Sequence, residues 1–170
     1  MTLTATLAVK VNADLAAALD LATPSSALNR TYSTALTNGT GAGNADKIWH
    51  DQRTLAASAT EDLDLAGSLT DALGNAVVFA RIKGIIVFAA AANTNDVLVG
   101  GVAAGLSTII QPQTTGLVVV RPGAVFAVMA GVADSTGYAV TATTADLLHV
   151  ANSTSGSSVT YDVIVIGCSA

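Results

Sequence analysis

The fold class is decided by short stretches of alternating polarity, and residues 4–11, TATLAVKV, are the clearest of them. Apolar side chains occupy every second position, at Leu7, Val9 and Val11. A β-strand has a side-chain period of two, so it carries all three on one face. This stretch therefore predicts a strand, and the segments on its C-terminal side extend the same architecture.

Two further strands are predicted before residue 38. Residues 15–22 alternate in the same way, although Asp14 could instead cap a short alanine-rich helix. The stop at residues 22–26, ATPSS, comes after about eight residues, which is short for a helix and favours a strand. Residues 27–37 predict the third strand. We therefore expect residues 1–37 to form an N-terminal β arm or meander.

A glycine-rich connection follows at residues 38–44, NGTGAGN. Its glycines do not have the spacing of the dinucleotide-binding fingerprint, which also needs a strand before it and a helix after it. We interpret the stretch as a flexible link or wide turn.

The remainder of the chain repeats a strand–turn pattern with no sustained helical period. In residues 60–65, Leu63 and Leu65 are expected inward and Asp62 and Asp64 outward. The expected strands cover residues 48–55, 60–65, 77–91, 96–100, 117–120, 124–130, 137–142, 146–151 and 159–167. Many short strands separated by polar turns are typical of sandwiches and barrels. We predict an all-β fold, with a jelly-roll-like β-sandwich over residues 38–170 that forms one compact unit with the N-terminal segment.

Three local features refine this prediction. Arg81 and Lys83 lie on one side of the long apolar segment 77–91, so we expect this central strand to emerge into solvent. Residues 93–96, NTND, are interpreted as a hairpin turn, because Asn and Asp tolerate left-handed conformations. Pro122 cannot donate to a sheet ladder, so it marks a strand end or an edge.

The composition argues against nucleic-acid binding and leaves the oligomeric state open. Hydrophobic residues make up 51% of the chain, but only 4% are aromatic and 11% are charged. Small side chains bury little area each, which is consistent with self-association or with an ordinary alanine-rich domain. The net charge is −5 with seven scattered Lys and Arg, so no basic stripe is present for a phosphate backbone.

Features of export and membrane insertion are absent from the sequence. The first residues lack the charged segment and apolar core of a signal peptide. No apolar run approaches the ~20 residues that span a bilayer, so we expect no membrane partner and synthesis in a reducing cytoplasm. The single cysteine, Cys168, excludes an intrachain disulfide and is interpreted as a small apolar residue of the last strand. Asn29, Asn38 and Asn152 begin glycosylation triplets that we interpret as turns.

Candidate metal and acid–base residues are few. His50 and His149 are far apart in sequence, and neighbours on a strand such as His50 and Asp51 point to opposite faces. The densest carboxylate group is Glu61, Asp62, Asp64 and Asp71. A calcium site there is conceivable, but the EF-hand spacing is absent. We interpret these carboxylates as a solvated outer face.

No catalytic motif is recognisable in the sequence. A Gly-x-Ser-x-Gly elbow, a P-loop and a His-Glu-x-x-His helix are all missing. Trp49, Tyr138 and Tyr161 are the candidates for stacking on a sugar, although scattered rings are more often core or interface residues. We therefore expect a non-enzymatic protein without catalytic, cofactor-binding or metal-binding residues and without a cofactor.

Six stretches of the chain carry a resemblance to a known group of proteins. They are residues 38–49 (NGTGAGNADKIW), 51–67 (DQRTLAASATEDLDLAG), 79–83 (FARIK), 91–95 (AANTN), 120–123 (VRPG) and 161–167 (YDVIVIG). In this order the chain resembles small structural proteins encoded among the head and tail genes of tailed bacteriophages and prophages. The resemblance covers residues 38–167, and its motifs are structural rather than catalytic.

This resemblance implies that the chain is a virion protein. Within that class, the chain resembles a capsid decoration (cement) protein most. Such a protein binds the outer capsid surface, contacts the major capsid protein, forms a homo-oligomer that is often a trimer, and stabilises the head. The expected location is the capsid surface of the virion, after synthesis in the host cytoplasm. The alternatives are a tail, neck or fibre-associated structural protein and a carbohydrate-binding adhesion module; an enzyme comes third.

Overall fold

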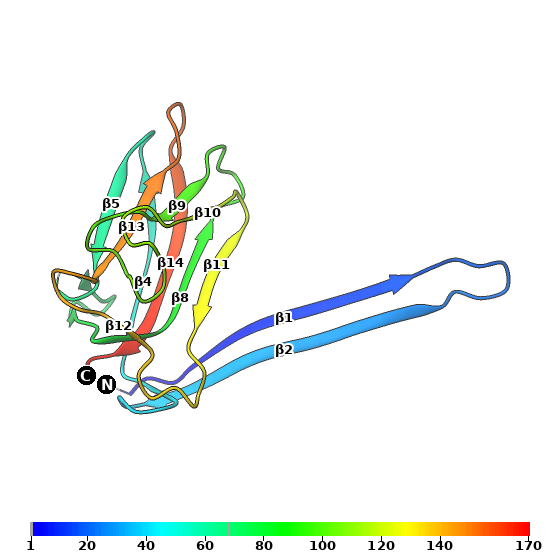
Figure 1. Ribbon diagram of the computed structural model, residues 1–170, viewed down its shortest axis with the longest axis horizontal. Coiled ribbons are helices and arrows are strands. Elements are labelled where there is room, and N and C mark those ends of the chain that lie inside the picture. Colours follow the sequence, from blue (N-terminus) through cyan, green and yellow to red (C-terminus); the bar gives the residue numbers. More distant parts are fainter. Residues whose placement is uncertain (1, 68) are drawn as a thin grey trace.

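The computed structural model describes residues 2–67 and 69–170, and within them it contains strands and no helix. The predicted all-β sandwich is therefore confirmed (Figure 1). The strands are β1 (Ala5–Ala16), β2 (Ser25–Asn38), β3 (Asn44–Ala45), β4 (Lys47–Leu55), β5 (Thr60–Asp64), β6 (Leu69–Thr70), β7 (Ala76–Val77), β8 (Arg81–Ala89), β9 (Val97–Gly100), β10 (Leu117–Val120), β11 (Val125–Met129), β12 (Tyr138–Ala139), β13 (Leu147–Asn152) and β14 (Val159–Cys168).

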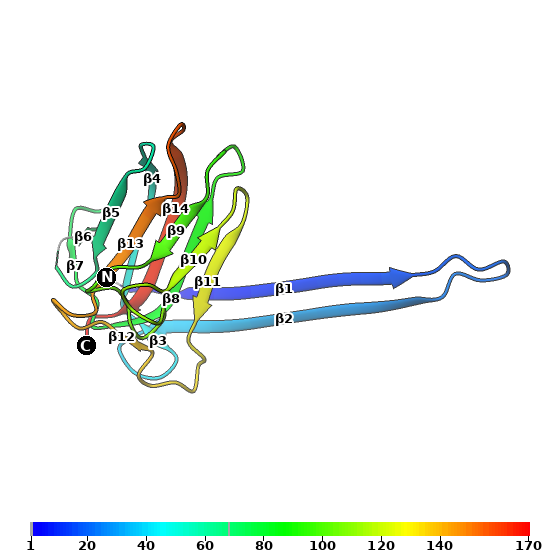
Figure 2. The same ribbon diagram turned by 45° about the horizontal axis from the view of Figure 1, so that its top comes forward.

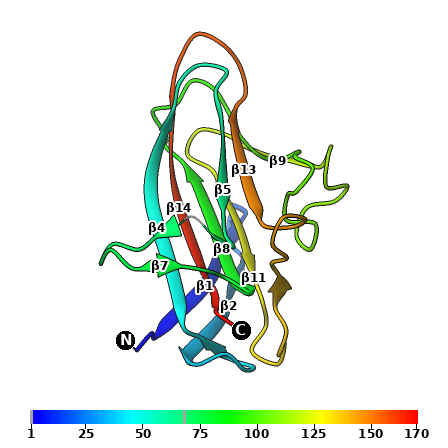
Figure 3. The ribbon, with the colours of Figure 1, turned by 90° about the vertical axis from the view of Figure 1, so that its left-hand side faces the viewer.

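Two antiparallel sheets form the body. The first, which we call the β14 sheet, has the order β11-β8-β14-β4, with β12 also paired to β8. The second, the β13 sheet, has the order β10-β9-β13-β5. The eight main strands, numbered 1 to 8 in chain order, are β4, β5, β8, β9, β10, β11, β13 and β14. In these numbers the β14 sheet, starting from β4, has the order 1-8-3-6, and the β13 sheet, starting from β5, has the order 2-7-4-5. Figure 3 views the sandwich with the N-terminal hairpin pointing away from the viewer.

The main core lies between the two sheets and follows from strand alternation. Val159, Tyr161, Val163 and Val165 of β14 are all fully buried on its inward side. Leu63 and Leu65 point inward as predicted, with exposed fractions of 4% and 0%. Mutual burial of these two inward faces is the main hydrophobic stabilisation of the body.

The first two strands leave the body as a long hairpin, which we call the arm (Figures 1 and 2). β1 and β2 pair over twelve residues, from Ala5 opposite Leu36 to Ala16 opposite Ser25. The predicted three-stranded meander is therefore wrong in detail, because residues 15–22 are not a separate strand. They finish β1 and form most of the arm's tip, where the Leu19 amide donates to the Ala22 carbonyl at 2.9 Å.

Other local predictions are corrected by the sheet topology. Residues 93–96 are not a hairpin turn, since β8 and β9 on either side of them belong to different sheets. Lys83 does not lead β8 into solvent; it is 1% exposed, and its Nζ donates to the Asp134 carbonyl at 2.8 Å. Residues 77–91 divide into β7 and β8, and only Tyr138–Ala139 of residues 137–142 form a strand. The stop before Pro122 is confirmed: β10 is an edge strand that ends at Val120.

Candidate functional site

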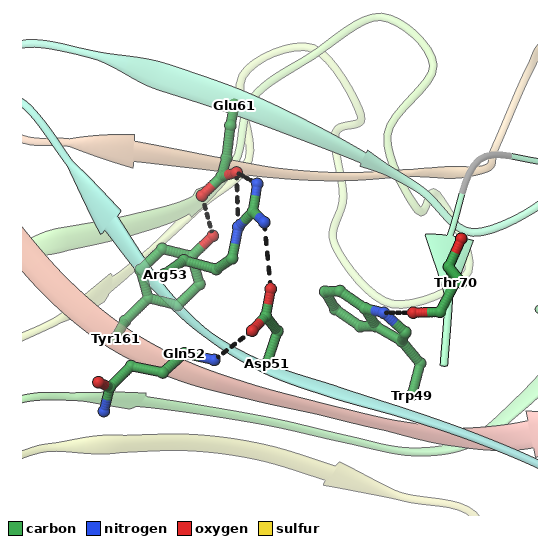
Figure 4. Close-up of polar contacts among 7 residues, drawn as sticks. All are labelled: Trp49, Asp51, Gln52, Arg53, Glu61, Thr70 and Tyr161. Carbon is green, nitrogen blue, oxygen red and sulfur yellow. Dashed lines mark hydrogen bonds and ion pairs between the residues drawn. The ribbon is translucent and has the colours of Figure 1, made fainter. Parts of the chain in front are cut away.

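The most connected group of polar side chains lies where β4 and β5 face each other across the sandwich (Figure 4). Arg53 donates from Nε and Nη2 to Glu61 Oε2, at 3.0 and 2.6 Å. The Tyr161 hydroxyl donates to the other carboxylate oxygen of Glu61 at 2.5 Å. A second ion pair joins Arg53 to Asp51 at 3.1 Å. These residues link strands β4 and β14 of one sheet to β5 of the other.

The electrostatics of this group indicate a structural link rather than a reactive site. The hydrogen bond to Glu61 is the main cause that raises the pKa of Arg53, which therefore stays charged. Burial, followed by the hydrogen bond to Glu61, raises the pKa of Tyr161 well above its ordinary value, so the phenol stays neutral. Both oxygens of Glu61 are engaged, which leaves no carboxylate oxygen of this residue unpaired to act on a substrate.

The two candidate histidines lie on different sheets. His149 of β13 contacts Asp62 of β5, its register partner, with 2.6 Å between Nδ1 and Oδ1. His50 lies on β4, with register partner Ile164 of β14. The structure therefore does not bring the histidines together into one site.

The remaining candidate carboxylates are engaged in turns. Asp64 accepts from the Ala66 amide at 2.9 Å. Asp71 accepts from the amides of Leu73 and Asn75 at 2.9 and 2.8 Å, and the Asn75 amide is the main cause that lowers the pKa of Asp71. Across residues 2–67 and 69–170, no group of three or more His, Cys, Asp or Glu side chains is placed to hold a metal ion.

The candidate sugar-stacking aromatics belong largely to the core. Trp49 is 4% exposed and Tyr161 is 0% exposed, and the Trp49 indole donates to the Thr70 carbonyl at 3.2 Å. Tyr138 is half-buried against the main core. The exposed tyrosine is Tyr32 of the arm, with 63% of its surface accessible, and the sequence did not single it out.

Cys168 also has a structural position. It is the last residue of β14 and is fully buried, as the sequence predicted for a small apolar residue of the final strand. Burial raises the pKa of its thiol, which lowers the fraction present as the nucleophilic thiolate.

A shallow hollow of about 440 Å³ lies beside Trp49 and the β6–β7 hairpin. Asp46, Lys47, His50 and Asp71 supply its charged or titratable lining groups. The Asp46 carboxylate accepts hydrogen bonds from the Ser169 amide at 2.8 Å and from the Ser169 hydroxyl. The Asp71 carboxylate is already engaged in its own turn. The hollow therefore has no convergent set of free polar groups that would identify a ligand.

The arm carries the most unusual surface of the molecule. Alternation places five large apolar side chains on one side of the hairpin, and each of them is at least 42% exposed. We call this set the apolar side. Its members are Val9, Val11, Leu15, Leu28 and Tyr32. The opposite side is small and polar, with Lys10, Asn12 and Thr31 among its members. Isolated apolar side chains on a surface are common, but a continuous exposed row marks an interaction site.

A second apolar surface lies on the body, on the side of the β14 sheet that faces away from the core. We call it the outer face, and its apolar members are Ile48, Ile86, Phe88, Val125, Ala127, Met129 and Ile164. The base of the arm covers one end of it, where Leu7 and Leu36 pack with Ile166, Ile86 and Met129. The apolar side of the arm therefore lies on the same strand face as Leu7 and Leu36, which cover one end of the outer face.

Sequence reasoning found the alternation in residues 4–11 but not the surface that this alternation produces. Leu7, Val9 and Val11 follow one pattern, yet Leu7 is 4% exposed and Val11 is 42% exposed. The difference depends on where the hairpin leaves the body, which is a property of the tertiary structure.

Comparisons of the chain with protein-family models, with curated proteins and with solved structures found no match. Among residues 2–67 and 69–170, no helix is both long and apolar enough to traverse a lipid bilayer.

Proposed function

We propose that this protein is a structural component of a bacteriophage virion, and specifically a capsid decoration protein. It binds the outer surface of the head through protein–protein contacts and stabilises it without catalysis. The observation that carries the proposal is the arm, which projects a row of exposed apolar side chains away from a well-packed sandwich. A surface of this kind is stabilised when it becomes buried against a neighbouring subunit.

Two other observations support a binding role. The polar groups at the β4–β5 edge are engaged with one another. The strand orders 1-8-3-6 and 2-7-4-5 correspond to two interlocked Greek keys, and on this basis we assign the winding to a jelly roll, an architecture found in viral capsid proteins. The stretches that resemble phage head and tail structural proteins lie in this sandwich and the linker before it.

The proposal is tested by co-sedimentation of the purified protein with expanded capsids whose outer surface is free of decoration. We expect the protein to pellet with the capsids and to reach saturation at a fixed ratio to the major capsid protein. Decorated capsids should also resist heat or dilution better than bare ones. Absence of saturable binding would overturn the decoration role, and binding to purified tails or necks instead would assign the protein there.

A further inference from the structure

We infer, on the basis of the proposed structural role, that the occupant of the apolar side is a second copy of this chain. The arm of one copy lies across the outer face of the β14 sheet of the next copy. Each subunit thus gives one arm and receives one arm. Three observations support this assignment: continuity, size and charge.

Continuity shows that the two surfaces are compatible. At its base, the arm already packs onto the outer face of its own body, and Leu7 and Leu36 are 4% and 2% exposed there. Gly84 allows this close approach, because a Cβ at this position would collide with Leu7. The same kind of contact, apolar hairpin side on apolar sheet face, is therefore made once within the chain. The arm then departs from its own body (Figures 1 and 2). Val9 and Tyr32 of the arm are therefore 43% and 63% exposed, and Val125 of the outer face is 58% exposed.

The sizes of the two surfaces match. Residues 9–32 provide twelve residues in each direction along the arm, which at 3.3 Å per residue gives a ribbon about 40 Å long and about 10 Å wide. The ten residues of β14 give the outer face a length of about 33 Å, of which the base of the chain's own arm covers one end. One side of the ribbon covers roughly 400 Å², so each arm-on-sheet contact buries roughly 800 Å² over its two copies. A single contact of this size is smaller than a standard specific interface, so the two contacts that each copy makes in a closed ring are needed together.

Charge also favours a second copy. Arg30 is the charged residue on the apolar side of the arm, where it lies opposite Val11. On the outer face, the outward positions of the four main strands include one carboxylate, Asp162, next to the neutral Gln52 that donates to it at 2.9 Å. A docked arm can therefore pair its cation with the anion of the receiving sheet, which fixes register as well as attraction.

The geometry of exchange determines the kind of assembly. The donor and acceptor surfaces differ, so the contact is heterologous; it closes into a ring or grows into a filament. A discrete small ring is the form compatible with a head-decorating protein.

The test is light scattering of the full-length protein over a concentration series, with matched variants. We expect a discrete oligomer for the wild type and at least a tenfold weaker association for Val11→Asp. The control is Asn12→Asp, the neighbouring position on the polar side, which should remain oligomeric. Arg30→Asp should also dissociate, and adding Asp162→Arg in the same chain should restore the oligomer. Near-ultraviolet circular dichroism of the buried Trp49 checks that each variant keeps a folded body.

The outcomes separate this inference from the decoration role. A monomeric wild type, or equal effects of V11D and N12D, overturns arm exchange. If the monomer still binds capsids and V11D abolishes that binding, the arm's partner is the capsid and only the exchange is wrong. If the wild type is oligomeric and sensitive to V11D but ignores capsids, arm exchange is correct and the decoration role is wrong.

Discussion

Tyr161 connects the core to the polar link between the two sheets, and this position makes it sensitive to high pH. Its pKa is raised by burial and by Glu61 above the ordinary value of 10.0 that it regains on unfolding. The unfolded chain therefore loses the phenolic proton at a pH where the native chain keeps it. The contribution of Tyr161 to the free energy of unfolding is therefore fully present below pH 10. Above pH 10 this contribution falls, by at most about 1.4 kcal/mol per pH unit.

The corresponding prediction is that Tyr161→Phe reduces this alkaline loss of stability. At pH 8 the variant should lose about 1 kcal/mol, because one hydrogen bond to Glu61 disappears. Between pH 9.5 and 11 its free energy of unfolding should fall less steeply than that of the wild type. Urea unfolding at several pH values measures both effects. Identical slopes for Y161F and wild type would contradict the prediction.

Gly167 is required by a close approach of two backbones. The pairing of β14 with β8 shifts register between Ile166 and Gly167, and a Cβ at residue 167 would fall on the carbonyl oxygen of Arg81 and 2.9 Å from the Phe79 ring. Backbone atoms in a sheet cannot move aside as a flexible side chain does. We expect Gly167→Ala to lower the free energy of unfolding by about 1–3 kcal/mol. Gly131→Ala is the control, because a Cβ there meets open space, and equal losses for the two variants would count against this explanation.

At the scale of elements, the sequence predicted the strands of the body well and the arm incompletely. Alternation at Leu63 and Leu65 was sufficient to orient β5, since one face of that strand is buried. Residues 15–22 alternate too, but no sheet covers them, so the pattern could not distinguish a third strand from the end of a hairpin. Lys83 was expected in solvent because its charge suggested exposure, whereas a long-range carbonyl partner at Asp134 accommodates it in the interior.

The candidate site was harder to predict than the strands because it depends on contacts distant in sequence. Glu61 and Tyr161 are 100 residues apart, and nothing in their local sequence indicates that they meet. The outer face combines residues of β4, β8, β11 and β14, whose order in the sheet is not readable from alternation. The alternating apolar residues of β1 can be recognised from the sequence, but their exposure to solvent cannot.

The arm leads to a prediction about proteolysis. A two-stranded hairpin without other contacts is marginally stable, and Lys10 and Arg30 place two trypsin sites on it. In the oligomer a neighbouring sheet should protect them. We expect cleavage after Arg30, whose scissile bond is unchanged by the substitution, to be at least tenfold faster in Val11→Asp than in the wild type, as followed by mass spectrometry of the early fragments. Asn12→Asp should be cut slowly, and rapid cutting of the wild type would mean that its arm is unprotected.

At the scale of the whole molecule, the main core and the arm occupy separate parts of the chain. The main core contains no residue of the arm, whereas the exposed apolar row belongs wholly to it. The small cluster of Leu7, Leu36, Ala45 and Ile166 joins the two parts. A change confined to residues 9–32 should therefore remove association and leave the fold of the body intact.

Replacement of residues 9–32 by Asn-Gly tests this separation directly. Ala8 and Ser33 are register partners, so a two-residue turn of this type can connect them without disturbing the pairs below. Leu7 and Leu36 keep their contacts, and we expect a folded monomer with a Tm within about 3 °C of that of monomeric Val11→Asp, which corresponds to roughly 1 kcal/mol. Scanning calorimetry and light scattering measure the two properties. The shortened protein and V11D share every residue of the main core and differ in the presence of the arm. If the shortened protein fails to fold while V11D is a folded monomer, the arm stabilises the body itself.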